Sequence, residues 1–167
     1  MAYNIIKYCG ITHYDKILDF GCAKGFIVKA FRLLGFNTYG TDISEYVLEY
    51  ADPEIKPYIG KERINEPDWV IAKDIFEHLD EEEIKKFLKE YRDAKNMFLV
   101  IPLGDGEKFV VPEYEKDVTH VTKQTKEWWE ERFKEAGWEI ESFNYLVPGV
   151  KDNWSHYKEG NGFWILQ

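Results

Sequence analysis

The stretch ILDFGCAKG, from Ile17 to Gly25, decides the fold of this chain. It begins with four residues typical of a buried strand, turns at Gly21, and enters a helix after Gly25. A second short strand, over residues 37–40, ends just before Asp42. A strand, a glycine turn, a helix, a strand and then a carboxylate predict a ligand site at the carboxyl end of a parallel sheet.

Each polar group of this region has a use in binding a nucleoside that carries an amino acid. Gly21 lets the backbone turn sharply and leaves room beside it, and the first N–H groups of the following helix can hold a carboxylate. Asp42 can accept hydrogen bonds from both hydroxyls of a ribose, and Asp19 can stabilise a cationic amino group. Tight strand–helix packing at Gly21 and Gly25 is the alternative, but the position of Asp42 favours a nucleoside site.

The rest of the chain alternates helices and strands. Helices are predicted over residues 2–9, 25–34, 45–50, 80–91 and 126–136, and further strands over residues 56–59, 69–72, 97–101, 139–147 and 163–167. This order predicts one α/β domain over residues 1–167, a three-layer sandwich whose mostly parallel sheet ends in an antiparallel hairpin.

Two of these helices carry local signals at their ends or on one face. Asp80 with Glu83 three residues later predicts a capping box. In the helix after Gly25, the apolar spacing predicts one buried face made of Ile27, Ala30, Phe31 and Leu34.

Charge and composition argue against several classes of partner. The formal net charge of −9 repels phosphates and argues against a nucleic-acid substrate. No apolar run approaches transmembrane length and the N-terminus does not resemble a signal peptide, so no membrane association is expected. Cys9 and Cys22 are not spaced as metal ligands, which predicts reduced thiols, a cytoplasmic location and no metal site.

Four segments stand in a characteristic order along the chain. They are ILDFGCAKG (17–25), YGTDIS (39–44), DWVIAKDIFEHL (68–79) and DVTHVTKQTKEWWEERFKEAGWEI (117–140). The set resembles the class I S-adenosylmethionine (SAM)-dependent methyltransferases. The first two segments are similar to the first two motifs of that family. The last two are similar to the fourth-strand segment and the His-bearing segment of the branch whose members carry "EHL" after that strand.

The resemblance implies a Rossmann-like sheet of seven strands in the order 3-2-1-4-5-7-6. It also implies SAM as the cofactor, with S-adenosyl-L-homocysteine as its product. By position, the residues around the methionine part of SAM would be Asp19, Gly21, Cys22, Ala23 and Gly25. The resemblance places Asp42 at the ribose and Ile43 against the adenine, and puts Lys73 and Asp74 near the sulfonium and the substrate.

Three departures from the family pattern bear on function. Ala23 stands where the family often has a glycine, and one additional methyl group should leave cofactor binding intact. Residues 53–67 lack a clear acidic residue for the adenine amine, which leaves residues 63–66 as candidates. The residues KDIF at 73–76 replace the Asn/Asp-Pro-Pro-aromatic signature of base-amine methyltransferases, which argues against nucleobase N-methylation.

Two histidines are candidates for a general base. Methyl transfer to a hydroxyl requires removal of its proton, and histidine is the side chain best suited to take it near neutral pH. His120, in the long segment after the fifth strand, is the first candidate, with Asp117 as its orienting partner. His78 is the second, although it could instead pack beneath the helix that starts near Asp80.

Together these features predict a methyltransferase that moves a methyl group from SAM to a small-molecule acceptor, at oxygen. The alternative is a SAM-binding module or partner subunit without its own catalysis, because almost nothing precedes residue 17 to cover the site. A nicotinamide oxidoreductase is disfavoured, since Gly21 and Gly25 do not form the pattern G-x-G-x-x-G.

Overall fold

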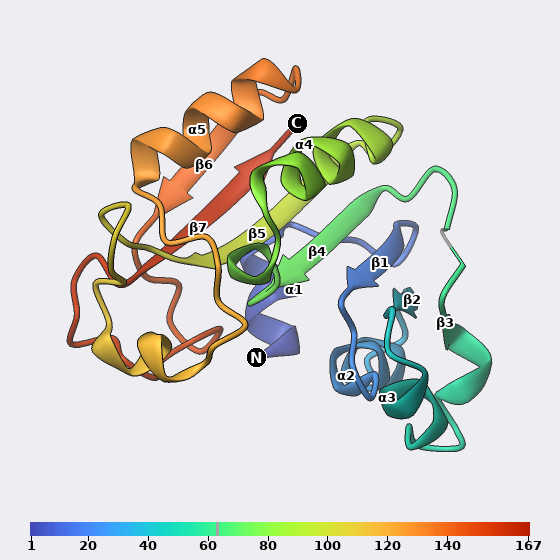
Figure 1. Ribbon diagram of the computed structural model, residues 1–167. Helices are drawn as coiled ribbons and strands as arrows, with labels where there is room; N and C mark the ends of the chain where they lie inside the picture. Colours follow the sequence, from blue (N-terminus) through green and yellow to red (C-terminus); the bar gives the residue numbers. More distant parts are fainter. Residues whose placement is uncertain (63) are drawn as a thin grey trace.

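The computed structural model describes residues 1–62 and 64–167, so Arg63, one of the adenine candidates, lies outside the described residues. Seven strands form one sheet in the order β3-β2-β1-β4-β5-β7-β6, which confirms the predicted order (Figure 1). The first five pair in parallel, and β7 is antiparallel to both β5 and β6. Their bounds are Lys16–Phe20 (β1), Asn37–Thr41 (β2), Ile59–Gly60 (β3), Trp69–Lys73 (β4), Asn96–Pro102 (β5), Ile140–Asn144 (β6) and Asn161–Leu166 (β7).

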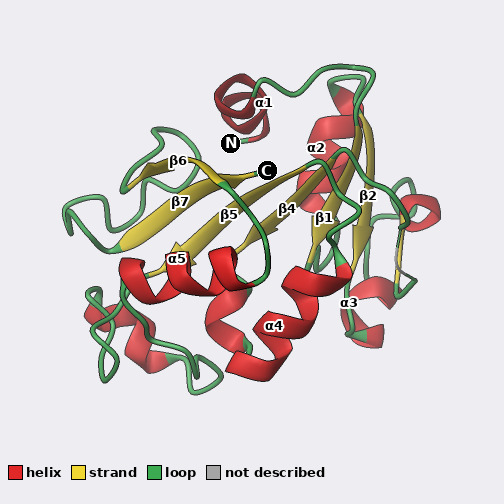
Figure 2. Cartoon of the chain, turned by 90° about the horizontal axis from the view of Figure 1, so that it is seen from above, coloured by secondary structure: helices red, strands yellow, loops and turns green. Residues whose placement is uncertain are grey.

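Helices cover both faces of this sheet (Figure 2). The helices α1 (Ala2–Cys9) and α2 (Phe26–Leu33) lie on one face, and α4 (Glu81–Glu90) and α5 (Lys126–Glu135) lie on the other. Successive strand residues point to opposite faces, so Ile17 packs in the α1–α2 core and Leu18 in the α4–α5 core. The short helix α3 (Glu45–Glu49) and the 3-10 turns η1 (Lys56–Tyr58), η2 (Phe76–His78) and η3 (Pro112–Lys116) complete the elements. Among the described residues, no helix is long and apolar enough to cross a membrane.

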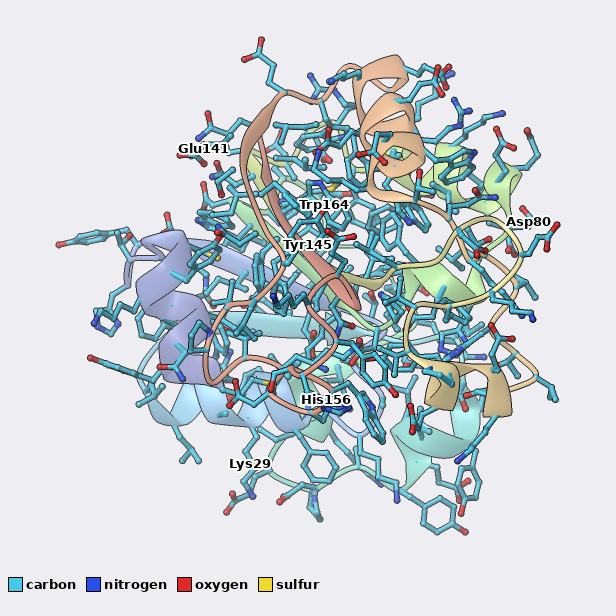
Figure 3. All side chains as sticks on the ribbon, turned by 90° about the vertical axis from the view of Figure 1, so that its left-hand side faces the viewer. Lys29, Asp80, Glu141, Tyr145, His156 and Trp164 are labelled. Atoms are coloured by element: carbon cyan, nitrogen blue, oxygen red, sulfur yellow. The ribbon has the colours of Figure 1, made fainter. Side chains whose placement is uncertain are left out.

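The predicted helix start at Asp80 is confirmed. The Asp80 side chain accepts from the Glu83 N–H at 2.8 Å, and the Glu83 side chain accepts from the Asp80 N–H at 2.9 Å, which is a complete capping box. Asp80 lies at the periphery of the molecule, whereas Trp164 of β7 lies at its centre and is fully buried (Figure 3). The capping box therefore fixes where the chain leaves the turn after β4 and enters α4.

Two local predictions about packing and strand length were only partly right. On α2, Phe31 is buried and Ile27 and Ala30 are partly buried against the same core, as predicted. The buried Val28 was not predicted, and Leu34 is 45% exposed because it forms the C-cap where the chain leaves the helix. The strand predicted over residues 139–147 ends at Asn144. Asn144 with Phe163 is the last residue pair between β6 and β7.

The third strand is also shorter than predicted. Residues 56–58 form a 3-10 turn with a proline inside it, and only Ile59 and Gly60 pair with β2. Proline lacks an N–H and cannot donate to a strand ladder. The edge strand beside β2 is therefore only two residues long.

Candidate active site

A pocket of about 520 Å³ opens where β1, β2 and β4 end. Its volume falls within the range of roughly 300–1,000 Å³ that is typical of small-molecule sites. The apolar side chains in its lining include Phe20, Ile43, Ile75, Leu79 and Phe87, and the polar ones include Asp42, Lys61, His78, Glu83 and Lys86. Apolar walls with a few convergent polar groups suit a ligand that has a flat ring and a polar sugar.

The glycine turn closes tightly between β1 and α2. Gly21 has a φ of 72°, and a Cβ atom there would lie 2.1 Å from Cδ1 of Ile75. Gly25 has a φ of 73°, and a Cβ atom there would lie 2.7 Å from Cγ2 of Ile55. Both positions therefore require glycine for packing as well as for backbone conformation, and the packing explanation accounts for these two residues by itself.

Asp42 lies in the pocket lining and is tied to the turn. Its Oδ2 accepts from the Ala23 N–H at 2.9 Å, and its Oδ1 accepts from the Ser44 N–H at 2.8 Å. A carboxylate has about four acceptor positions, so these two bonds hold Asp42 in place and leave capacity for ligand hydroxyls. Ala23 itself has a φ of 46°, the left-handed region that favours glycine. The substitution of the usual glycine is thus accommodated by the fold.

Asp19 is buried with an unpartnered oxygen. The residue is 2% exposed, and its Oδ2 has no hydrogen-bond partner among the described residues. Burial raises the pKa of Asp19 to about 8, with the charge of Lys73 acting against this shift and that of Asp42 adding to it. A buried carboxyl group without a donor costs free energy. Asp19 is not among the residues that line the pocket, and its role toward a ligand amino group stays a prediction.

Lys73, the last residue of β4, and Asp74 after it belong to a partly buried charge cluster. Asp74 has a φ of 57° and binds both Lys73 and Lys151, whose side chains are 17% and 3% exposed. Burial alone would raise the pKa of Asp74, but the positive charges of Lys151 and Lys73 outweigh it and hold that pKa below its usual value. The positive charge of Lys73 therefore favours the ionised form of both Asp74 and the neighbouring Asp19.

The His-bearing segment packs on the turn that follows β4. The N–H groups of Val121 and Thr122 donate to the carbonyl oxygen of Glu77 at 2.8 and 3.1 Å, and Thr122 Oγ1 donates to the carbonyl of Leu79 at 2.6 Å. These bonds bring His120 against His78, with ring centroids 4.6 Å apart. The two histidines therefore form one pair.

Hydrogen bonds orient both rings. His120 Nδ1 lies 2.8 Å from the carbonyl oxygen of Tyr114, and His78 Nδ1 lies 2.9 Å from Thr119 Oγ1. Thr119 Oγ1 in turn donates to Asp117 Oδ1 at 2.6 Å. Asp117 thus orients His78 through Thr119, and its other oxygen lies 3.7 Å from Nε2 of His120. Burial and the neighbouring His120 lower the pKa of His78, so its ring is neutral at pH 7.

Of the predicted site residues, those that line the pocket are Gly21, Asp42, Ile43 and His78. The others lie outside its lining: Asp19, Cys22, Ala23, Gly25, Lys73, Asp74, Asp117 and His120. Cys22 packs its side chain with Val28 and Ile55 in a small core cluster, so its backbone alone faces the turn. His120 has 9% of its side chain exposed and reaches the site through its contact with His78.

Sequence reasoning missed two buried charged residues. Glu77 lies inside the EHL segment and is 1% exposed, and burial together with the charge of Asp74 raises its pKa to about 8. Lys151 lies in the loop between β6 and β7 and is 5% exposed. Neither residue has a local signal, because what buries it comes from distant parts of the chain.

Known proteins share this fold. Residues 18–94 match the protein family described as a methyltransferase domain. A SAM-dependent methyltransferase from Archaeoglobus fulgidus is similar in structure, with a TM-score of 0.76 at 14% identity over 99% of this chain and 91% of that chain. The Haloferax volcanii complex of the Trm112 methyltransferase activator with a methyltransferase has a TM-score of 0.72 at 14% identity, over 99% of this chain and 89% of that chain. A glycopeptide N-methyltransferase complexed with sinefungin has a TM-score of 0.70 at 11% identity, over 99% of this chain and 84% of that chain. Comparison with curated proteins gives no match.

The chain therefore has the fold of the SAM-dependent methyltransferases, and residues 18–94 carry the sequence pattern of a methyltransferase domain. Both findings support the class I methyltransferase family.

Proposed function

We propose that this protein is a methyltransferase of the EHL branch that moves a methyl group from SAM to a small-molecule acceptor, at oxygen. The observation that carries the proposal is the pair of carboxyl groups at the ends of adjacent strands. Asp42 lies in the lining of a nucleoside-sized pocket, and Asp19 is buried with an unpartnered oxygen. A packing role for the glycine turn does not account for either carboxyl group.

The residues divide into a cofactor half and an acceptor half. Asp42 would hold the ribose, Ile43 would lie against the adenine, and Asp19 would hold the amino group, with Gly21, Ala23 and Gly25 shaping the turn. When bound, SAM supplies a methyl group already activated by the sulfonium. The acceptor half, built from His78 and His120 beside the buried lysines, then has to orient a nucleophile and take its proton.

Oxygen is the acceptor atom that this half favours. A hydroxyl has to lose a proton for methyl transfer, and two histidines with oriented rings are suited to that task. The free thiols of Cys9 and Cys22 fit the cytoplasmic location we propose. The nitrogen acceptor of the glycopeptide methyltransferase and the Trm112 partner of the Haloferax protein belong to those proteins.

Binding of SAM or S-adenosyl-L-homocysteine, measured by titration calorimetry, tests the cofactor half directly. We expect one site per chain. If titration with either ligand to millimolar concentration produces no heat of binding, the proposal is wrong. Binding without methyl transfer to any acceptor in a broad screen of hydroxylated small molecules would favour the non-catalytic SAM-binding module.

His120→Ala is expected to lower kcat by about 100-fold, within the range that a general base contributes. The dissociation constant for SAM should change little, because His120 lies outside the cofactor half. Initial rates with an acceptor from the screen, combined with SAM titrations, measure both quantities. His156→Ala, an exposed histidine of the β6–β7 loop, is the matched control and should keep full activity. Equal rates for His120→Ala and the control would remove His120 from the mechanism.

A further inference from the structure

Three side chains in the acceptor half gather metal-ligating atoms that the proposed methyl transfer does not by itself require. One ligand atom each from Glu77, His78 and His120 lies within 4.8 Å of the other two. We propose that these residues bind one divalent transition-metal ion of the Zn²⁺, Co²⁺ or Mn²⁺ class. The donors come from two segments distant in sequence, which is why no local spacing predicts this site.

In both imidazoles Nδ1 makes the hydrogen bond, which leaves Nε2 available as a metal ligand. A carbonyl oxygen can only accept, so His120 Nδ1 donates its proton to Tyr114. The Thr119 hydroxyl donates to Asp117, so its lone pair accepts from Nδ1 of His78. In the neutral form of either ring, Nε2 therefore carries the lone pair. Metal-binding histidines characteristically donate their second ring N–H to a carbonyl, carboxylate or other fixed acceptor, as these two do.

Glu77 supplies the negative ligand. It is 1% exposed, and its Oε2 has no hydrogen-bond partner among the described residues. The nearby ammonium groups of Lys73 and Lys151 bind Asp74. Burying a carboxyl oxygen without a partner is costly, and a metal ion is a partner that the two histidine nitrogens can share.

The backbone holds the three ligands together before any ion binds. The carbonyl oxygen of Glu77 accepts from the N–H groups of Val121 and Thr122, next to His120. Ligands on a tetrahedral Zn²⁺ at about 2.0–2.1 Å lie roughly 3.4 Å from one another. Side-chain rotations that move the donor atoms by about an ångström bring separations of up to 4.8 Å into that range.

Two histidines and one carboxylate suit a borderline transition metal and leave coordination positions open. His78 lines the pocket, so an open position there would be reachable by an acceptor oxygen. With an ion bound, Nε2 of each histidine is a ligand and cannot also take a proton. If the proposed methyl transfer is correct, the ion would then act in place of the histidine base, because a metal-bound acceptor hydroxyl would lose its proton to water more readily. This consequence rests on the proposed function, whereas the metal site itself does not.

Metal binding can be measured on the full chain without any turnover. After dialysis against a chelator, Mn²⁺ and Zn²⁺ are titrated calorimetrically, and Co²⁺ is titrated while its visible absorption is followed. We expect one ion per chain. Glu77→Gln and His120→Ala should each weaken binding by about 100-fold, and Thr119→Val, which removes the partner of His78 Nδ1, by about tenfold. His156→Ala should bind as the wild type does.

The outcomes separate this inference from the proposed function. Unchanged affinity in Glu77→Gln with its thermal unfolding intact, or equal losses in His156→Ala, would overturn the metal site. SAM titrations on the same samples report on the cofactor half independently. If Glu77→Gln fails to fold, the exposed position of Thr119 makes Thr119→Val the deciding variant, and unchanged binding there overturns the assignment of the ligand nitrogen on which the site depends.

Discussion

Asp42→Ala is expected to weaken SAM binding by about 100-fold, which is the largest effect of any single change in the cofactor half. Each hydrogen bond from a ribose hydroxyl to a carboxylate contributes about 1.5 kcal/mol or more. Two such bonds correspond to roughly two factors of ten in the dissociation constant. Titration calorimetry with SAM and S-adenosyl-L-homocysteine measures the change, and both ligands should lose affinity equally because they share the ribose.

The control for Asp42 is an aspartate that makes the same local turn outside the pocket. Asp42 Oδ1 accepts from the N–H two residues later at 2.8 Å, and Asp52 Oδ1 accepts from the Glu54 N–H at 2.9 Å. Asp52→Ala should therefore reproduce the local destabilisation without the loss of affinity. If the two variants bind SAM equally well, Asp42 serves the turn and not the ribose.

Asp19→Asn is expected to change stability and cofactor affinity in opposite directions. The folded pKa of about 8 lies above the unfolded value near 3.9, so ionisation of Asp19 destabilises the ligand-free fold progressively as pH rises from about 4 to 8. Asparagine cannot ionise and should raise the unfolding temperature at pH 7 by about 5 °C. SAM affinity should fall by about tenfold or more, because a charge-assisted bond to the ligand amino group is lost.

Proton release provides a second measurement of the same residue. At pH 7 the empty site holds Asp19 protonated, and a bound ammonium group favours the carboxylate. SAM binding should therefore release close to one proton in the wild type, and affinity should rise as pH increases toward 8. Calorimetry at pH 7 in buffers of different ionisation enthalpy measures the number of protons released on SAM binding. Asp19→Asn should release none of it.

Asp68→Asn is the matched control for Asp19. Its carboxylate accepts from the Lys16 N–H at 2.7 Å, and that bond together with Lys95 lowers the pKa of Asp68. Losing this charge should lower the unfolding temperature at pH 7, the opposite sign to Asp19→Asn, and leave SAM binding unchanged. Unaltered SAM affinity in Asp19→Asn would assign Asp19 to packing alone.

The strand order and the glycine turn were predictable because their signals are local or recur in a known family. Apolar runs bounded by glycine and proline indicated the strands, and the resemblance supplied their order across the sheet. The helix face after Gly25 was predicted correctly for Ile27, Ala30 and Phe31 but not for Leu34, because the helix ends one residue before it. A spacing rule identifies the period of a helix better than the residue at which it stops.

The sequence by itself determined the α/β class, the turn at Gly21 and the placement of Asp42 at the end of a strand. Each of these follows from neighbours along the chain. Only the tertiary structure decided that Asp19 lacks a partner, that Lys151 reaches Asp74, and that Glu77 and His78 meet His120. Burial and long-range hydrogen bonds produce these features, and both arise when segments distant in sequence pack together. The proposed cofactor half is therefore predictable from local sequence patterns, whereas the proposed acceptor half is formed only in the folded chain.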